Sequence, residues 1–260
     1  MRTEIIYEDA ELLVAYKSAG LATQSGRVGQ ADMVSELKKY LARQAKTPGK
    51  EPYLGLVHRL DQPVEGLLVF GKTKSATAVL SAQLSKDILN KTYLALVYGT
   101  ERTRGTGLAV HLEDYMIKDD GNVARIVDGE KGETGSSKHE KENVKKAILT
   151  YESLKTLDVS PFLCEGCSTE MEKHDLNVTL IRVELTTGRF HQIRCQMAHA
   201  GFPLIGDQKY GNERSLELSK LLGVKNVCLC ASTITFKHPK TGKIMNFEIK
   251  PKNPMFKEFI

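Results

Sequence analysis

The sequence lacks the long apolar runs and the cysteine framework that mark membrane and secreted proteins. No apolar run approaches the roughly 20 residues that a bilayer-spanning helix needs, and the opening MRTEIIYED contains no apolar signal core. The five cysteines are an odd number without regular spacing, which argues against a disulfide scaffold. These absences predict a cytoplasmic protein that has no membrane partner.

Neither sign of charge is in large excess. Lysine and arginine number 37 against 32 aspartates and glutamates, which gives a net charge of +5 and a pI near 8.8. A mildly basic balance permits a nucleic-acid partner without requiring one. The 260 residues are 41% hydrophobic, which is ordinary for a globular protein and sufficient for a full core.

Hydrophobic patterns predict strands at both ends of the chain and two or three helices between them. Strands are predicted over 12–16, 67–70, 92–98, 147–155, 178–185, 227–236 and 244–249, and helices over 31–44, from Thr73 or Ser75 to Leu84, and over 192–200. A hairpin is predicted within 117–146, and mobile or inserted segments near 129–146 and 156–177. The order favours an α+β fold with a mixed, mostly antiparallel central sheet flanked by a few helices and loops.

One segment places a carboxylate directly before a turn and a predicted buried strand. In residues 55–70, GLVHRLDQPVEGLLVF, Asp61 follows Arg59 by two positions. Strand-end loops present reactive groups from a rigid sheet, and a neighbouring cation would keep the carboxylate ionised as a nucleophile or base. The alternative is a surface Arg–Asp pair at a turn. For His58 we favour a hydrogen-bonded structural role over that of a general base.

A second segment gathers hydrogen-bond donors where a strand is predicted to end and a helix to begin. Residues 185–194, LTTGRFHQIR, contain Arg189, His191, Gln192 and Arg194. Helix N–H groups and guanidinium forks bind phosphates, so the segment predicts an anion site. The alternative is a solvated helix start with ordinary basic residues. For His191 we favour an orienting or backbone-bonding role over direct chemistry.

These segments, together with others in the same order, resemble the RluA-type RNA pseudouridine synthases. The matches are HRLD at 58–61, KTYLALV at 91–97, TGRFHQIR at 187–194, GDQKYG at 206–211 and FKHPKTG at 236–242, and KSAGL at 17–21 is similar to the family's early lysine-containing turn. The resemblance runs from about residue 5 to about residue 250. Five ordered matches are far more specific than any one of them.

The resemblance implies a pseudouridine synthase catalytic domain and three catalytic residues. It implies that Asp61 attacks the target uridine, that Tyr93 stacks on the flipped base and assists proton transfer, and that Arg194 pairs with the aspartate. A carboxylate can form the covalent or ion-paired intermediate, and the base must be flipped out of its stack before attack. No metal or organic cofactor is implied.

The expected partner is an RNA substrate, either ribosomal or transfer RNA. The resemblance associates Arg59 with RNA contact and base flipping. The substrate-binding residues that we predict are Arg59, His58, Arg189, His191 and Gln192. We expect a monomer, one catalytic domain over residues 1–260 and no separate N-terminal RNA-binding module, so further contacts would come from basic residues near 138–146 and 209–225.

Two positions depart from the family's pattern. Val64-Glu65-Gly66 stands where the family usually has Thr-Ser-Gly, and Cys195-Gln196 stands where it often has Val-His. A Glu65 carboxylate that pointed inward could disfavour ionisation of Asp61, so we expect it to point to solvent or to a basic neighbour. Asp207 is expected to be an exposed acid in a glycine-punctuated loop.

Two other functions compete with this interpretation. Cys164 and Cys167 form a C-x-x-C pair that could hold zinc with Cys228, Cys230 or His174. Cys228 and Cys230 fit a buried strand better, which leaves one good pair and favours free thiols in a surface insertion. The second alternative is a catalytically inactive RNA-binding protein of the same fold. The presence of all three expected catalytic residues, Asp61, Tyr93 and Arg194, argues against it.

Overall fold

A computed structural model describes residues 3–26, 29–44, 49, 51–99, 108–129, 144–162 and 176–260. The chain divides into two compact units. Unit 1 comprises Met1–Thr92 and Cys230–Lys252, and unit 2 comprises Tyr93–Leu229 and Asn253–Ile260. Cys164, Cys167 and His174 lie outside the described residues, as do most of the segments predicted to be mobile or inserted. The prediction of one catalytic domain stays a prediction.

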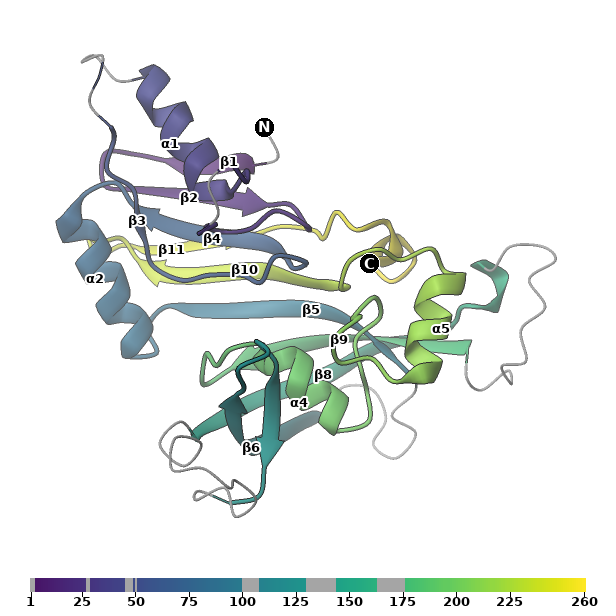
Figure 1. Ribbon diagram of the computed structural model, residues 1–260. Coiled ribbons are helices and arrows are strands. Elements are labelled where there is room, and N and C mark those ends of the chain that lie inside the picture. The colour runs from purple at the N-terminus through teal and green to yellow at the C-terminus, as the bar shows by residue number, and fades with distance from the viewer. Residues whose placement is uncertain are drawn as a thin grey trace. The chain divides into compact units, whose positions relative to one another are not determined.

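Unit 1 is built on a sheet whose strand order is β1-β2-β4-β10, with β3 paired to β4 and β11 paired to β10 (Figure 1). Its strands are β1 Thr3–Glu8, β2 Leu12–Lys17, β3 Gly55–Leu56, β4 Glu65–Gly71, β10 Leu229–Lys237, which begins one residue before the unit, and β11 Ile244–Glu248. The β4–β10 pair is parallel and the others are antiparallel. Every residue of β2 and β4 is buried, which explains the apolar runs at 12–16 and 67–70.

Two helices accompany the sheet of unit 1. Helix α1, Met33–Gln44, contacts β1, and helix α2, Lys74–Ser85, packs against β3 and β4. The Thr73 hydroxyl accepts the Ala76 N–H at 3.0 Å and caps α2. Of the two predicted starts of this helix, Thr73 and Ser75, Thr73 is therefore the cap. Apolar side chains of α2, β2, β4 and β10 form one core, which includes Leu12, Leu67, Val69, Leu80 and Ile234.

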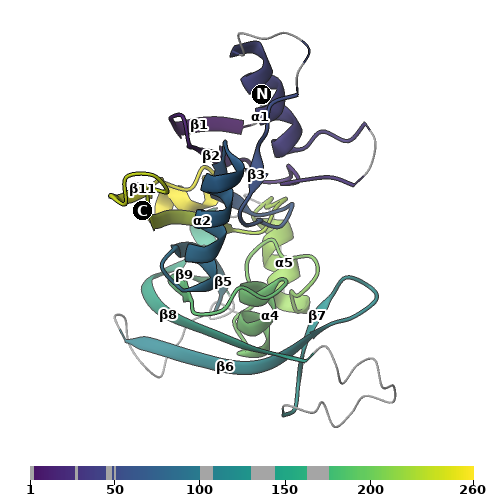
Figure 2. The ribbon, with the colours of Figure 1, turned by 90° about the vertical axis from the view of Figure 1, so that its left-hand side faces the viewer.

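Unit 2 contains strands in the order β5-β9-β8-β6-β7. They are β5 Asn90–Tyr98, whose first three residues belong to unit 1, β6 Ala109–Lys118, β7 Ala124–Val127, β8 Lys145–Asp158 and β9 Asn177–Leu185. Helix α4, Gln192–His199, lies against β6 and β8 in Figure 2 and contacts β7. Helix α5, Glu213–Leu221, was not predicted, and β8 extends to Asp158 into a segment predicted to be irregular.

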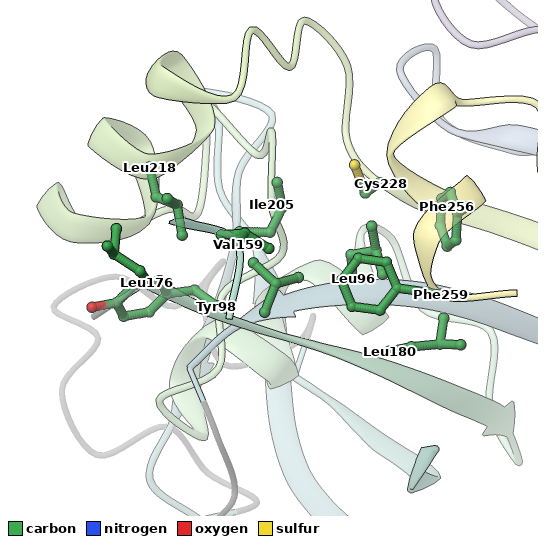
Figure 3. Packing of buried hydrophobic residues seen from close by; sticks show 11 residues of the cluster. Leu96, Tyr98, Val159, Leu176, Leu180, Ile205, Leu218, Cys228, Phe256 and Phe259 are labelled. Carbon is green, nitrogen blue, oxygen red and sulfur yellow. The ribbon is translucent and has the colours of Figure 1, made fainter. Parts of the chain in front are cut away.

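The core of unit 2 joins its strands to its C-terminal residues. Phe256 and Phe259 come from the short 3-10 helix Pro254–Glu258 and the residue after it, and Figure 3 shows them beside Leu96 and Leu180. A second short 3-10 helix, Ser160–Phe162, follows β8. Leu218 brings α5 to the same core. The observed elements confirm the α+β prediction, with a mixed and mostly antiparallel set of strands.

Candidate active site

Asp61 lies in a tight turn that leads directly into β4. Its carbonyl oxygen accepts the Val64 N–H at 3.1 Å, and its side chain is half-buried. At the start of β4, Gly66 has φ +131°, and a Cβ there would come within 2.5 Å of backbone atoms of Ala231. Only glycine permits this close approach of β4 to β10. The position of the Asp61 turn is thereby fixed by the sheet of unit 1.

Lys17 ties β2 to the same turn. Its side chain is fully buried, and its ammonium donates to the carbonyl oxygens of Leu21 at 2.7 Å, Gln62 at 3.1 Å and Ser18 at 3.2 Å. Burial lowers the pKa of Lys17 to about 7, against the opposing effect of the Asp61 and Glu65 charges. The early lysine-containing turn is therefore an electrostatic and hydrogen-bonding support for the loop that carries Asp61.

Glu65 was expected to point to solvent or to a basic neighbour, and burial shows that solvent was the wrong alternative. Its residue is only 2% exposed, and its carboxylate accepts the Tyr16 hydroxyl at 2.5 Å and the Lys252 backbone N–H at 3.1 Å. Burial and the hydrogen bond to Glu65 raise the pKa of Tyr16 well above its usual value. Glu65 faces inward because it is the first residue of β4, where both faces of the strand are covered.

The two other predicted residues of this segment differ in exposure. His58 is buried; its Nε2 faces the Val69 N–H at 3.4 Å, and Nδ1 has no hydrogen-bond partner among the described residues. Burial, with a contribution from the Lys91 charge, holds the pKa of His58 well below its usual range. Arg59 is exposed and donates to the Gln24 amide oxygen at 2.9 Å. Burial supports the structural role for His58, whereas contact of the exposed Arg59 with a substrate stays a prediction.

Arg194 forms a buried ion pair in unit 2. Its Nε and Nη2 lie 2.7 Å from the two carboxylate oxygens of Asp207, and the two side chains are 6% and 0% exposed. The same carboxylate accepts the N–H groups of Lys209 and Tyr210 at 3.0 and 3.2 Å. The prediction of an exposed Asp207 was therefore wrong, because the loop folds back on α4. The sequence GDQKYG indicates a loop, but nothing in it indicates that the Asp207 side chain is buried.

Gln192 and His191 organise the start of α4. The Gln192 side-chain oxygen accepts the Arg189 N–H at 2.9 Å, and its amide donates to the Ile148 carbonyl at 3.0 Å. His191 has the left-handed conformation, φ 53° and ψ 26°, and its Nδ1 lies 2.8 Å from the Tyr210 hydroxyl. Both side chains thus hold the loop in shape, as favoured for His191. Contact of either residue with a substrate stays a prediction.

A basic pocket lies beside this loop. It encloses about 340 Å³ and is lined by Met116, Ile117, Lys118, Ala124, Lys145, Gly188, Arg189 and Phe190. Lys118 Nζ sits 4.7 Å from the centroid of the exposed Phe190 ring, which stacks on His191 at 3.8 Å. Arg189 Nε is held by the Lys146 carbonyl at 2.8 Å. Sequence reasoning missed Lys118, which only the β6–β7 hairpin brings to the Arg189 segment, and Phe190, which lies within that segment but was not identified as a pocket residue.

The predicted catalytic residues are divided between the two units. Asp61 belongs to unit 1, with Arg59 and His58, whereas Arg194 and Tyr93 belong to unit 2. Tyr93 is a buried residue of β5. The pairing of Asp61 with Arg194 stays a prediction.

Metal ligands do not cluster in the part of the chain that the structure describes. No group of three or more histidine, cysteine or acidic side chains is placed there to hold a metal ion. Cys228 and Cys230 are both buried, as their strand pattern predicted. Among the described helices, none is long and apolar enough to cross a membrane.

Comparison with known proteins identifies the family. The model of the RNA pseudouridylate synthase family matches residues 11–199, a span that contains the Asp61 turn, Tyr93 and Arg194. The chain belongs to this family and is a pseudouridine synthase, as the resemblance to the RluA-type enzymes predicted.

Named relatives agree with this assignment, and a solved structure has the same fold. The chain is 32% identical to the ribosomal large subunit pseudouridine synthase C of Rickettsia felis, over 95% of this chain and 67% of that protein. It is 30% identical to the protein of the same name from Pasteurella multocida, over 100% and 68%. Human RNA pseudouridylate synthase domain containing 4 has the same fold, with a TM-score of 0.67 at 19% identity over 96% of this chain and 89% of that one. The chain spans about two thirds of the length of the two bacterial relatives.

Proposed function

We propose that this protein converts uridine to pseudouridine in ribosomal RNA, with Asp61 as the nucleophile. The family match over residues 11–199 is the observation that carries the proposal. Two relatives at 30% identity or more are named as ribosomal large subunit pseudouridine synthases, which favours ribosomal RNA over the transfer RNA that the sequence also allowed. A cytoplasmic monomer is the form that we expect to act.

The reaction is an isomerisation that needs no redox partner or activated donor. The bond between uracil N1 and ribose C1′ breaks, the base rotates, and a bond forms between C5 and C1′. The proton leaves C5 and N1 gains one, so atoms and electrons balance within the nucleotide. Asp61 would hold the detached unit through a covalent or ion-paired intermediate. The substrate base must first leave its stack.

The surroundings of Asp61 suit a nucleophile that must be held in one place. The turn is closed by the Asp61–Val64 backbone bond, and the Gln62 carbonyl accepts the Gly20 N–H at 2.8 Å and the buried Lys17 ammonium. A fixed carboxylate loses little orientational freedom when the substrate arrives. The Asp61 charge in turn raises the pKa of the buried Lys17 ammonium, which belongs to the same unit.

Tyr93 and Arg194 complete the proposed chemistry. The Tyr93 ring would stack on the flipped base while it is detached, and its hydroxyl would assist proton transfer. Arg194 would pair with Asp61 in the working enzyme. Its bidentate bond to Asp207 leaves the guanidinium rigidly oriented on α4, and a rigid cation is an effective electrostatic partner.

RNA contacts would come from Arg59 and from the basic pocket. Arg59 is exposed two residues before Asp61. Lys118, Lys145 and Arg189 line a pocket to which no aspartate or glutamate contributes among the described residues. Phosphate neutralisation by such cations is the main source of RNA affinity.

A tritium-release assay tests the proposal, because the C5 hydrogen of uridine is lost when the new carbon–carbon bond forms. With ribosomal RNA labelled at C5, Asp61→Asn should release tritium only at the background rate while keeping RNA affinity and fold. Asp87→Asn, which removes the same charge from an exposed residue of left-handed φ, should act like the wild type. Near-normal release by Asp61→Asn would show that another group is the nucleophile.

The same assay separates the alternatives. If the wild type binds RNA and releases no tritium, the inactive RNA-binding protein is the correct interpretation. Activity should survive exhaustive chelation, since no metal is proposed in the reaction. Activity that chelation abolishes and zinc alone restores would favour a metal site that includes Cys164 and Cys167.

A further inference from the structure

The basic pocket of unit 2 contains an apolar surface as well as cations. Its charged side chains are Lys118, Lys145 and Arg189, and its apolar ones include Met116, Ile117 and Phe190. Its volume of about 340 Å³ lies near the lower end of the range of roughly 300–1,000 Å³ that small-ligand sites occupy. Phosphate binding uses the cations alone, so it leaves the apolar surface without a ligand.

Phe190 presents an aromatic ring to this pocket from a fixed position. The residue is 39% exposed, and its ring stacks on the His191 imidazole with centroids 3.8 Å apart and an interplanar angle of 21°. The imidazole is itself fixed, because its Nδ1 lies 2.8 Å from the Tyr210 hydroxyl and its edge meets the Tyr210 ring. The two stacked rings therefore form a platform that is already in place before a ligand binds.

One face of the Phe190 ring is covered only by a flexible side chain. The imidazole of His191 occupies one face, so the Lys118 ammonium, 4.7 Å from the ring centroid, lies over the other. Lys118 is an exposed residue at the end of β6, and its long side chain is free to turn toward a phosphate. A cation–π contact at an exposed site is weaker than the stacking of a nucleobase on an aromatic ring. A base can therefore replace the ammonium on this face.

We propose that this pocket binds one unpaired nucleotide of the RNA, separate from the target uridine. Its base stacks on Phe190, and its phosphates are neutralised by Lys118, Lys145 and Arg189. A base inside a duplex does not fit, because its faces are covered by its neighbours. Stacking accepts any base, so the site selects single-stranded RNA rather than a sequence. The inference deepens the proposed function and rests on it, since the nucleotide belongs to the RNA substrate.

Tryptophan fluorescence tests the stacking directly, because the chain contains no tryptophan. Phe190→Trp places a single fluorophore on the platform, and single-stranded oligouridylate at low salt should quench it. Inorganic tripolyphosphate can bind the cations but cannot stack, so it should not quench. Phe162→Trp, at a residue of unit 2 that is 44% exposed, is the matched control and should not be quenched by either.

Three results of this titration would overturn the proposal. The first is an absence of quenching by oligouridylate in Phe190→Trp, and the second is equal quenching by tripolyphosphate. The third is saturation by uridine 5′-monophosphate at the same concentration as by oligouridylate, which would identify a site for a free nucleotide instead of one in RNA.

The salt dependence of binding separates stacking from charge. Phe190→Leu should weaken the binding of single-stranded RNA by about five- to a hundredfold, while the slope of log K against log salt stays unchanged because no phosphate contact is lost. Phe190→Tyr, which keeps the ring, and Phe162→Leu should bind like the wild type. Unchanged affinity in Phe190→Leu overturns the proposal. A changed slope also overturns it, because Phe190 would then act only by holding Lys118.

Tritium release distinguishes failure of this site from failure of the proposed function. Phe190→Leu should raise KM and leave kcat unchanged, since the platform binds the RNA and takes no part in the reaction. A loss of kcat with unchanged KM overturns the binding role while the proposed function stands. A wild type that forms no pseudouridine overturns the proposed function, whereas the quenching experiment decides the nucleotide site by itself.

Discussion

The Arg194 guanidinium and the Asp207 carboxylate exchange two charged hydrogen bonds at 2.7 Å with almost no solvent contact. Both groups are already desolvated in the folded state, and each compensates the charge of the other. Removing one partner of such a pair leaves an unpaired buried charge. Asp207 therefore has a structural role that an exposed loop acid would not have, and it orients a residue proposed to be catalytic.

Asp207→Asn should lower the free energy of unfolding by about 3 kcal/mol, because it leaves the Arg194 charge without its carboxylate. Urea unfolding at neutral pH measures the change. The matched control is Asp87→Asn, which alters an exposed acid and should change stability by less than about 0.5 kcal/mol. Equal stability of the two variants would mean that Asp207 contributes little to Arg194.

His58 should make the fold sensitive to acid. Its pKa lies well below the usual histidine value because of burial and the Lys91 charge, so the unfolded state binds more protons below about pH 6.5. The contribution of neutral His58 to stability is then fully present above that pH and is lost as the pH is lowered. Between pH 7 and pH 5 the protonation of this group should lower the free energy of unfolding.

Urea unfolding at the two pH values measures that loss, which His58→Gln should remove from the pH dependence. His111→Gln is the control, since the His111 side chain is 58% exposed on β6. A wild type and a His58→Gln variant with the same dependence on pH would show that His58 is not buried as a neutral group.

At the scale of elements, the sequence predicted the helices and strands whose buried residues follow a regular apolar pattern. The apolar run at 67–70 and the alternation at 178–185 became β4 and β9 because each exposes few of its residues. Helix α5 escaped prediction because its buried residues are Ser215, Leu218 and Ser219, only one of which is apolar. The Asn212 cap, which accepts the Ser215 N–H at 2.9 Å, was the local signal for it.

In the candidate site, too, some features could be predicted from the sequence and others could not. Motif positions could be identified from the sequence. Burial of Glu65, however, depends on strand β10, which is distant along the chain, and burial of Asp207 depends on how its loop folds back on helix α4. The pocket at Arg189 likewise requires Lys118 of the β6–β7 hairpin and Lys145 of β8. Contacts of this kind are set by tertiary structure, and no short-range pattern encodes them.

The basic pocket predicts how the hairpin contributes to RNA affinity. Lys118→Ala combined with Lys145→Ala should weaken RNA binding and reduce the slope of log K against log salt by about one for each phosphate that is no longer neutralised. Filter binding at several salt concentrations measures both quantities. Lys257→Ala, which alters an exposed lysine near the C-terminus, is the control. An unchanged slope in the double variant would place the phosphate contacts elsewhere.

At the scale of the whole molecule, the two units are interleaved along the chain. The chain passes from unit 1 to unit 2 after Thr92, returns after Leu229 and leaves again after Lys252. Unit 1 therefore needs residues from both sides of unit 2, and unit 2 needs the C-terminal residues that follow unit 1. Phe256 and Phe259 belong to the core of unit 2. Neither unit corresponds to one continuous segment that could fold as the chain emerges.

This interleaving predicts one cooperative unfolding transition, as expected for a single catalytic domain. The sequence contains no tryptophan, so Tyr53→Trp in unit 1 and Phe162→Trp in unit 2 would each introduce one fluorescent reporter at a residue that is 42% or 44% exposed. The two reporters and far-ultraviolet circular dichroism should give the same midpoint and slope in urea. The reason is that each unit is connected to segments of the other, so that neither can unfold without disturbing the other. Midpoints that differ between the reporters would show that the units unfold separately and that the single-domain prediction is wrong.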